Sequence, residues 1–259
     1  MVPTSEETGD LVIEGREGDD PGIDAAIAAN PDPTPEAAPS VDPSAGGVGQ
    51  STQALLSTRG STLATEARRI AGFTDRPTSY YSTTTYMNES TGTRRTDCTG
   101  LMTYILKRKA LSGYNLIPIS SGASHPLSSD FYNYFISRPT TANPGTSARW
   151  RRILKPASLK PGDVIAYRYA TTSSEGTTGH TMMVKEYPTT GRYRELLVKV
   201  VDSARSGHAN DTRGTRWSGP GTGTIGIKTD SVGTAIGYYW SGGVSTTLNQ
   251  TKLAFGRLE

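Results

Sequence analysis

The stretch RRTDCTGLM, residues 94–102, contains the single cysteine of the chain, Cys98. Apolar residues follow this cysteine three, four and seven positions later, which is the spacing of one helix face. Asp97 stands directly before it and is of a residue type that caps helix N-termini. The sequence therefore predicts a helix that carries Cys98 in its first turn, buries its apolar face and ends near Gly113.

A cysteine in this position is chemically distinctive. The unpaired N–H groups at a helix N-terminus favour the thiolate, which is the nucleophilic form of the side chain. The carboxylate of Asp97 would oppose this if it faced the sulfur, but an N-cap side chain points at backbone amides instead. The alternative is a buried, inert cysteine, which is the commonest role of a lone Cys.

A nucleophilic cysteine needs a base, and the chain has three histidines. His180 opens the apolar segment TMMVKEY, where a strand end borders a cleft, and we expect Gly179 before it to leave room for a substrate backbone. His208 lies in the segment RSGHAND and is a candidate for lining the site. His125 precedes a proline and is predicted to be a surface or packing residue. We therefore predict that His180 is the base.

The third member of such a site is a hydrogen-bond acceptor that fixes the imidazole tautomer. Asp202 ends the apolar segment LLVKVVD, in a strand expected to pair with the strand of His180. A carboxylate at the end of an apolar strand is costly to bury without a partner. His180 is one candidate partner, and a structural salt bridge or a turn cap is the alternative.

The charge of the chain divides into two parts. Residues 1–50 contain eleven acidic residues and one basic residue, which gives a net charge of −10, whereas residues 51–259 contain 26 Lys and Arg against 13 acids, which gives +13. We predict that the acidic, Pro- and Ala-rich segment 1–50 is a disordered leader or linker, because it cannot bury enough apolar surface to fold. Residues 51–259 form the predicted domain, whose positive charge favours an anionic partner without choosing among wall polymer, nucleic acid and acidic lipid.

Hydrophobic patterning predicts helices before strands. A helix is expected over 61–72, and a short one within 124–135, in addition to the helix of Cys98. Strands are expected within 160–170, 179–187, 194–203, 221–241 (two strands) and 252–257. The segment 188–193 is predicted to be a hairpin turn. This order of helices followed by antiparallel strands is typical of the α+β class.

Four segments together resemble a known family. TDCTGLMTYIL, LKPGDVIAYR, GHTMMV and VVDS occur in this order within roughly 80–205 and are similar to the NlpC-type cell-wall peptidases, which are papain-like cysteine enzymes. The resemblance implies a papain-like α+β fold, with the helix that carries the cysteine packed on an antiparallel sheet. It makes Cys98 the nucleophile, His180 the base and Asp202 the orienting residue.

The same resemblance places further residues at the site. Tyr81 corresponds to the tyrosine that helps to shape the oxyanion site, and Asp97 and Thr99 are its expected neighbours on the oxyanion and substrate side. The chain departs from the family at Thr99, where serine is usual, and at Asp202, where histidine is commoner. A long insert also separates the cysteine helix from the Pro-Gly-Asp segment.

The function implied is a cysteine peptidase or amidase that hydrolyses peptide bonds in bacterial peptidoglycan stem peptides. Such an enzyme would be secreted or periplasmic and monomeric, although the N-terminal MVPTSEETGD has no basic region followed by an apolar one. An acyltransferase on the same Cys-His scaffold and a non-catalytic wall-binding module are the alternatives, and a toxin delivered to rival cells would share the chemistry.

Other classes are excluded or disfavoured by the residues. One cysteine rules out an internal disulfide framework, and its spacing from the histidines fits no common zinc motif, so no metal or cofactor is expected. No apolar run reaches about 18 residues, which argues against a membrane span. The segment GTGTIG, 221–226, is followed by a strand pattern, so we expect no nucleotide role. With the resemblance to cell-wall peptidases, the expected anionic partner is peptidoglycan and not nucleic acid. The three tryptophans are expected in the core.

Overall fold

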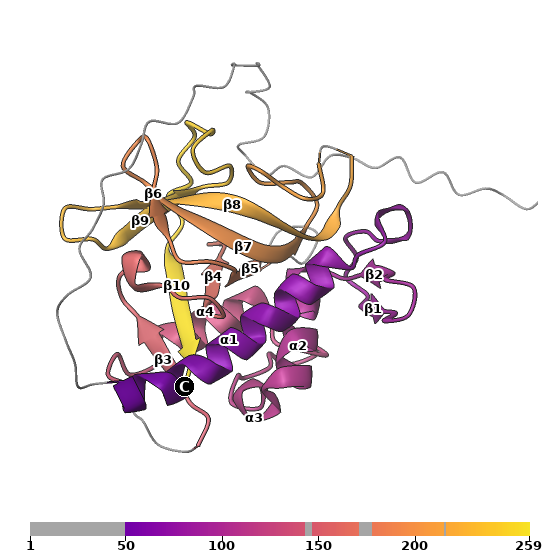
Figure 1. Ribbon diagram of the computed structural model, residues 1–259, viewed down its shortest axis with the longest axis horizontal. Coiled ribbons are helices and arrows are strands. Elements are labelled where there is room, and N and C mark those ends of the chain that lie inside the picture. The colour runs from indigo at the N-terminus through magenta and orange to yellow at the C-terminus, as the bar shows by residue number, and fades with distance from the viewer. Residues whose placement is uncertain (1–49, 143–146, 171–177, 215) are drawn as a thin grey trace, which may run out of the picture.

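The computed structural model describes residues 50–142, 147–170, 178–214 and 216–259, with side chains from residue 59 onwards. The predicted disordered leader lies outside this range except for Gln50. The described chain is α+β, with helices gathered on one side of a curled antiparallel sheet (Figure 1).

Within the described ranges, four α-helices and two short 3-10 turns precede or interrupt the strands. The helices are α1 (Gln50–Gly72), α2 (Cys98–Lys109), α3 (Leu111–Tyr114) and α4 (Ser128–Ile136), and the 3-10 turns span Arg76–Thr78 and Pro156–Ser158. The predicted helices of the cysteine segment and of 124–135 are thereby confirmed. The first helix begins eleven residues earlier than predicted, because the added residues include good helix formers whose apolar spacing alone gave no signal. The cysteine helix ends at Lys109, before a non-helical residue at 110, so that Gly113 falls within the separate helix α3.

The part of the chain that the structure describes has ten strands, which form one small hairpin and one large sheet. The hairpin is made of β1 (Tyr86–Met87) and β2 (Arg94–Arg95). The large sheet contains β3 (Trp150–Ile153), β4 (Val164–Arg168), β5 (Gly179–Val184), β6 (Thr189–Thr190), β7 (Leu196–Ala204), β8 (Gly219–Thr229), β9 (Ala235–Tyr239) and β10 (Leu253–Leu258). All of the strands expected from the sequence are confirmed, whereas the hairpin, β3 and the two-residue β6 within the predicted turn were not expected.

The order of the large sheet differs from the order along the chain. Its strands run β3-β10-β4-β5-β7-β8-β9, all antiparallel, and β6 pairs with one end of β7. Strand β10 is therefore inserted between β3 and β4, although every other strand precedes it in sequence. The pairing of β5 with β7 is the one predicted from the positions of His180 and Asp202.

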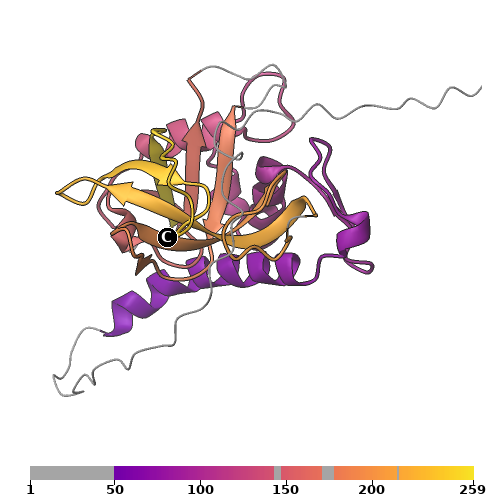
Figure 2. The same ribbon diagram turned by 90° about the horizontal axis from the view of Figure 1, so that it is seen from above.

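The sheet separates two apolar cores. One core lies between the sheet and the helices, and it contains residues from α1, α2 and α4 together with one face of β4, β5, β7 and β10. Helix α1 crosses this side of the sheet, and Figure 2 shows it running along the molecule beneath the strands in that view. Helix α2 contacts β5 and β7, as expected for the helix that carries the cysteine.

The second core lies on the opposite face, where the sheet curls upon itself. Tyr167 of β4 and Tyr238 of β9 stack with ring centroids 4.9 Å apart, although three strands separate β4 from β9 in the sheet order. Alternation along the strands distributes neighbouring side chains between the two cores, since Val164 and Ala166 face the helices while Ile165 and Tyr167 face the curl. In the part of the chain that the structure describes, no helix has the length and apolar character needed to cross a bilayer.

The Pro-Gly-Asp segment, residues 161–163, contacts both the helical layer and the sheet. Gly162 has a φ of +90°, and a Cβ at this position would lie 2.0 Å from the carbonyl oxygen of Gly60 in α1. The neighbouring Asp163 accepts two hydrogen bonds, of 2.8 and 2.7 Å, from the guanidinium of Arg257 in β10. Only glycine permits both this backbone conformation and this close approach of the helix.

We expect Gly162→Ala to lower the free energy of unfolding by about 2–6 kcal/mol. About 1–3 kcal/mol comes from the strained backbone, and overpacking against α1 adds a similar amount. Gly122→Ala is the matched control, because Gly122 has a φ of +82° with no atom near its missing Cβ. Urea denaturation of both variants gives the comparison, and equal losses would contradict the assigned contact between Gly162 and α1.

Candidate active site

Cys98 is the first residue of α2, and it is 4% exposed. The Asp97 side chain caps the helix by accepting a hydrogen bond of 2.6 Å from the backbone N–H of Gly100, which confirms the predicted N-cap. The carboxylate is therefore directed at the helix backbone, in the geometry in which it does not oppose a thiolate. Ser128, the first residue of α4, places its Oγ 3.7 Å from the Cys98 Sγ.

His180 is the second residue of β5 and is buried. The expectation that Gly179 leaves room for a substrate backbone was wrong, because the missing side chain makes room for a neighbouring strand. A Cβ at Gly179 would lie 2.0 Å from the carbonyl oxygen of Tyr167 in the neighbouring β4, and the φ of Gly179 is +145°. Glycine at this position is thus required by the close approach of two strands, which fixes where the His180 backbone lies.

The structure brings Cys98 and His180 together. Burial by itself lowers the pKa of His180, but the charge of the Cys98 sulfur, a hydrogen bond to it and the bonded Asp202 carboxylate outweigh burial and raise that pKa to about 10. The imidazole is consequently a cation at neutral pH.

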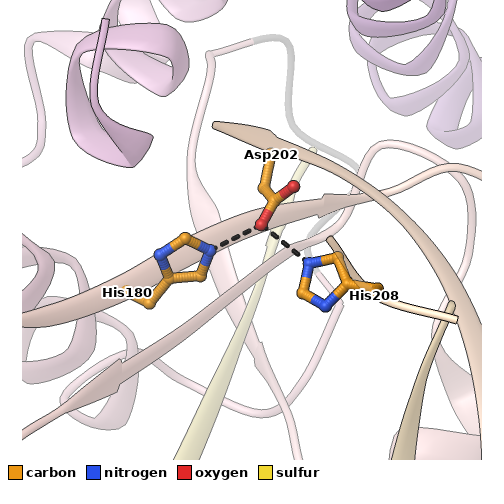
Figure 3. Close-up of side chains that lie close together, drawn as sticks. All are labelled: His180, Asp202 and His208. Atoms are coloured by element: carbon orange, nitrogen blue, oxygen red, sulfur yellow. Dashed lines mark hydrogen bonds and ion pairs between the residues drawn. The ribbon is translucent and has the colours of Figure 1, made fainter. Parts of the chain in front are cut away.

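Asp202 lies on the other side of the imidazole. Its Oδ2 is 2.7 Å from the Nε2 of His180, and the carboxylate is completely buried in β7, the strand next to β5 (Figure 3). Because Nε2 donates to Asp202, the remaining ring nitrogen, Nδ1, is available for Cys98. The three residues predicted as nucleophile, base and orienting acceptor therefore lie in a continuous series.

The Asp202 carboxylate has two further partners. His208 places its Nε2 2.9 Å from the same oxygen, Oδ2, and Arg213 donates a hydrogen bond of 2.8 Å to Oδ1. Burial would raise the pKa of Asp202, but Arg213, His208 and the hydrogen bond from His180 together hold it well below its usual value. Asp202 is therefore a permanently ionised acceptor. The predicted site-lining residue His208 contacts Asp202 rather than an open cleft.

Aromatic rings surround the two histidines. The ring of Trp240 lies 4.0 Å from the ring of His208 and 5.4 Å from that of His180. The ring of Tyr167 also packs against the ring of His180, with 5.9 Å between the two ring centroids. These rings exclude water from the imidazoles, which strengthens the charged hydrogen bonds to Asp202. Trp240 was expected in the core, and its position over the histidines was missed.

The other predicted site residues are Tyr81, Asp97 and Thr99, and their side chains have different partners. Burial raises the pKa of the Tyr81 phenol, and the charges of Cys98 and Asp97 raise it further, so this phenol remains protonated near the sulfur. Thr99 is buried, and its hydroxyl donates to Asp97 at 3.0 Å and lies 3.1 Å from the Nε2 of His125. Thr99 and Asp97 are thus bonded to one another. His125, predicted to be a surface or packing residue, lies beside this cap.

Sequence reasoning missed Arg213 as a member of the site. Arg213 is buried within a loop, and it is bonded to Asp211 as well as to Asp202. The segment NDTRGTRW gives no periodic signal, since neither helix nor strand spacing applies to a loop. The only available signal was that Arg213, a positively charged residue, lies close in sequence to Asp202.

A metal ion is the second chemistry that this cluster suggests. One ligand atom each from His180, Asp202 and His208 lies within 4.8 Å of the other two. The N–O distances of 2.7 and 2.9 Å are those of hydrogen bonds, and the guanidinium of Arg213 already supplies positive charge to Asp202. These contacts favour a hydrogen-bonded network over a set of metal ligands.

Comparison with known proteins identifies a relative. A protein of Acanthamoeba polyphaga mimivirus, named "Uncharacterized protein R653", is 31% identical over 165 residues, which cover 56% of this chain and 68% of the mimivirus protein. The chain belongs to the family of this mimivirus protein. The name of the mimivirus relative states no activity, so membership of the mimivirus family assigns none to this chain. No family model and no solved structure matches the chain.

Proposed function

We propose that the protein is a papain-like cysteine hydrolase that cleaves amide bonds through Cys98, His180 and Asp202. The observation that carries this proposal is the series of contacts from the Cys98 sulfur through the His180 imidazole to the buried Asp202 carboxylate. A sulfur at a helix N-terminus, a cationic imidazole and a fixed acceptor are the groups that nucleophilic catalysis by cysteine requires.

The reaction proceeds in two steps. The Cys98 thiolate attacks the carbonyl carbon of the substrate, and the C–N bond breaks as the His180 imidazolium transfers its proton to the leaving amine. The product of this step is a thioester with Cys98. Water then attacks the thioester while neutral His180 accepts its proton, which releases the carboxylic acid and restores the thiolate and imidazolium. Asp202 holds the ring through Nε2 during both proton transfers.

Charge on the substrate oxygen is stabilised by groups near the start of α2. The backbone N–H of Cys98 belongs to the first turn of the helix and is one donor. The phenol of Tyr81 is a second donor, because its raised pKa keeps it protonated beside the Cys98 sulfur. The hydroxyl of Thr99 bonds to Asp97 and so supports the cap rather than the oxyanion.

The substrate class comes from the resemblance to NlpC-type peptidases. We assign the stem peptide of bacterial peptidoglycan as substrate, so the enzyme acts in a secreted or periplasmic setting. The net charge of +13 on residues 51–259 supports an anionic polymer as partner, because it attracts phosphate and carboxylate groups over long distances.

Mass spectrometry of purified wall fragments tests the function. We expect the full chain to release products with a newly formed carboxylate and amine, and Cys98→Ala to release none above background, because no other thiol is present. Arg257→Lys serves as the control, since it alters a buried ion pair with Asp163 and leaves all groups named in the reaction in place.

The same spectra separate the alternatives. Acyl transfer would give products in which an added amine or alcohol, rather than water, has taken the acyl group. A non-catalytic wall-binding module would leave the fragments of wild type and Cys98→Ala identical while both bind the wall. Either result would overturn hydrolysis by Cys98.

A further inference from the structure

One carboxylate oxygen in the site is shared by two imidazoles. The Oδ2 of Asp202 accepts from the Nε2 of His180 and from the Nε2 of His208, on opposite sides of the carboxylate (Figure 3). The proposed reaction uses only His180. The side chain of His208 has no exposed surface, so it touches no substrate, and its role must be exerted through Asp202.

The hydrogen bonds of His208 define its charge. Its Nδ1 lies 2.9 Å from the backbone carbonyl oxygen of Trp240, and its Nε2 lies 2.9 Å from the ionised Asp202. Both partners accept hydrogen bonds and neither can donate one. The ring satisfies both contacts only when each nitrogen carries a proton, which makes His208 an imidazolium.

The network around His208 contains two carboxylates and a guanidinium. Asp202 and Asp211 are two buried negative charges, and Arg213 is bonded to both of them. Asp211 also accepts the backbone N–H of His208 at 2.8 Å. Arg213 is therefore divided between two carboxylates, and an imidazolium at His208 adds positive charge to a network that contains both of them. The titratable or charged groups facing the two imidazoles are Cys98, Tyr167, Asp202, Asp211 and Arg213.

We infer that His208 is a positioning residue that shares the Asp202 oxygen with His180 as an imidazolium and so limits how strongly Asp202 stabilises the protonated form of His180. This inference rests on the proposed function of the Cys98 and His180 pair. Asp202 without His208 would be a stronger acceptor, and His180 would release its proton less readily to the leaving amine. His208 therefore sets the pH range in which the pair works.

The direction of the effect follows from charge. Removing a positive charge near the pair disfavours the Cys98 thiolate and favours the His180 imidazolium. Both changes raise the pH at which Cys98 and His180 lose their protons. A residue with a merely structural role would reduce the amount of active protein without moving either limb of a pH profile.

The experiment measures the rate of Cys98 alkylation by iodoacetamide, and of wall-fragment hydrolysis, as functions of pH. For His208→Gln, which retains an N–H donor but has no charge, we expect both limbs to move up by about 0.5–1 pH unit and kcat to fall with KM unchanged. Arg213→Gln removes the other positive charge on Asp202 and should move the limbs in the same direction. Arg213→Lys keeps the charge and should leave them in place.

Arg257→Gln is the matched control, because it removes a buried positive charge from a different carboxylate, Asp163. It should lower the melting temperature without moving the limbs. Limbs that do not move in His208→Gln and Arg213→Gln would overturn the role of His208 while leaving the proposed function intact. A wild-type Cys98 that alkylates at pH 6 no faster than free cysteine would overturn the proposed function and this inference together.

A measurement on the wild type does not depend on the folding of any variant. Nitrogen-15 NMR of the histidine side chains distinguishes a ring with two N–H groups from a ring with one. We expect His208 to have two at neutral pH. A single protonated nitrogen on His208 would overturn the inference.

Discussion

Asp202→Ala should be the most destabilising single substitution in the site, with a loss of about 3–5 kcal/mol in the free energy of unfolding. The carboxylate is completely buried and accepts from His180, His208 and Arg213. Removing it leaves the positive charges of these groups buried without compensation, which costs more than the hydrogen bonds themselves. Urea denaturation at pH 7 measures the change.

An exposed carboxylate provides the control for this substitution. Glu186 forms an ion pair of 2.8 Å with Lys199, and both side chains are about half exposed. Glu186→Ala is expected to cost less than about 1 kcal/mol, since solvent screens such a pair. If Asp202→Ala cost no more than Glu186→Ala, the buried charge network would not exist in solution.

His180→Ala should have the largest effect on chemistry, with a loss of about 10²–10⁴-fold in hydrolysis and a large decrease in Cys98 alkylation at pH 7. In the proposed reaction, the imidazolium both stabilises the thiolate and supplies the proton for the leaving amine. Alkylation of the wild type unfolded in urea is the internal control, because it reports the same thiol without its partner. Equal alkylation of folded wild type and His180→Ala would contradict the pairing.

The same residue should make the stability of the protein decrease at alkaline pH. The pKa of His180 is raised from its ordinary value near 6.5 to about 10. The stability that this shift contributes is fully present below about pH 6.5 and is lost as the pH rises through about 10. Hydrolysis by wild type should decline over the same upper range, because the proton needed by the leaving amine is no longer held.

Local sequence signals gave the parts of the site that lie on regular elements. The spacing after Cys98, with Asp97 as cap, predicted α2 and the position of the sulfur in its first turn. The apolar segments that contain His180 and Asp202 predicted two strands, and their pairing followed from the short turn between them. These features depend on interactions among residues close in sequence or on one regular period, which a single sequence displays.

The remaining parts of the site depend on the curl of the sheet. Trp240 follows β9, at one edge of the sheet, and it reaches the histidines because the sheet folds back upon itself. Arg213 and His208 lie in a loop without periodicity. The second hydrogen-bond partner of His208, the carbonyl oxygen of Trp240, is distant in sequence. Neither a hydrophobic pattern nor a charge count contains the long-range geometry that brings them to Asp202.

The place of β10 in the sheet has a consequence for biosynthesis. Residues 253–258 are translated after all the other strands that the structure describes, yet they fill the gap between β3 and β4. Until that segment has emerged from the ribosome, β3 lacks the strand β10 with which it pairs, and β4 has an unpaired edge. An unpaired strand edge is the kind of surface that promotes aggregation. A nascent chain would therefore depend on chaperones or rapid completion, and nonsense codons shortly before residue 253 should yield insoluble polypeptide rather than a folded protein of lower stability.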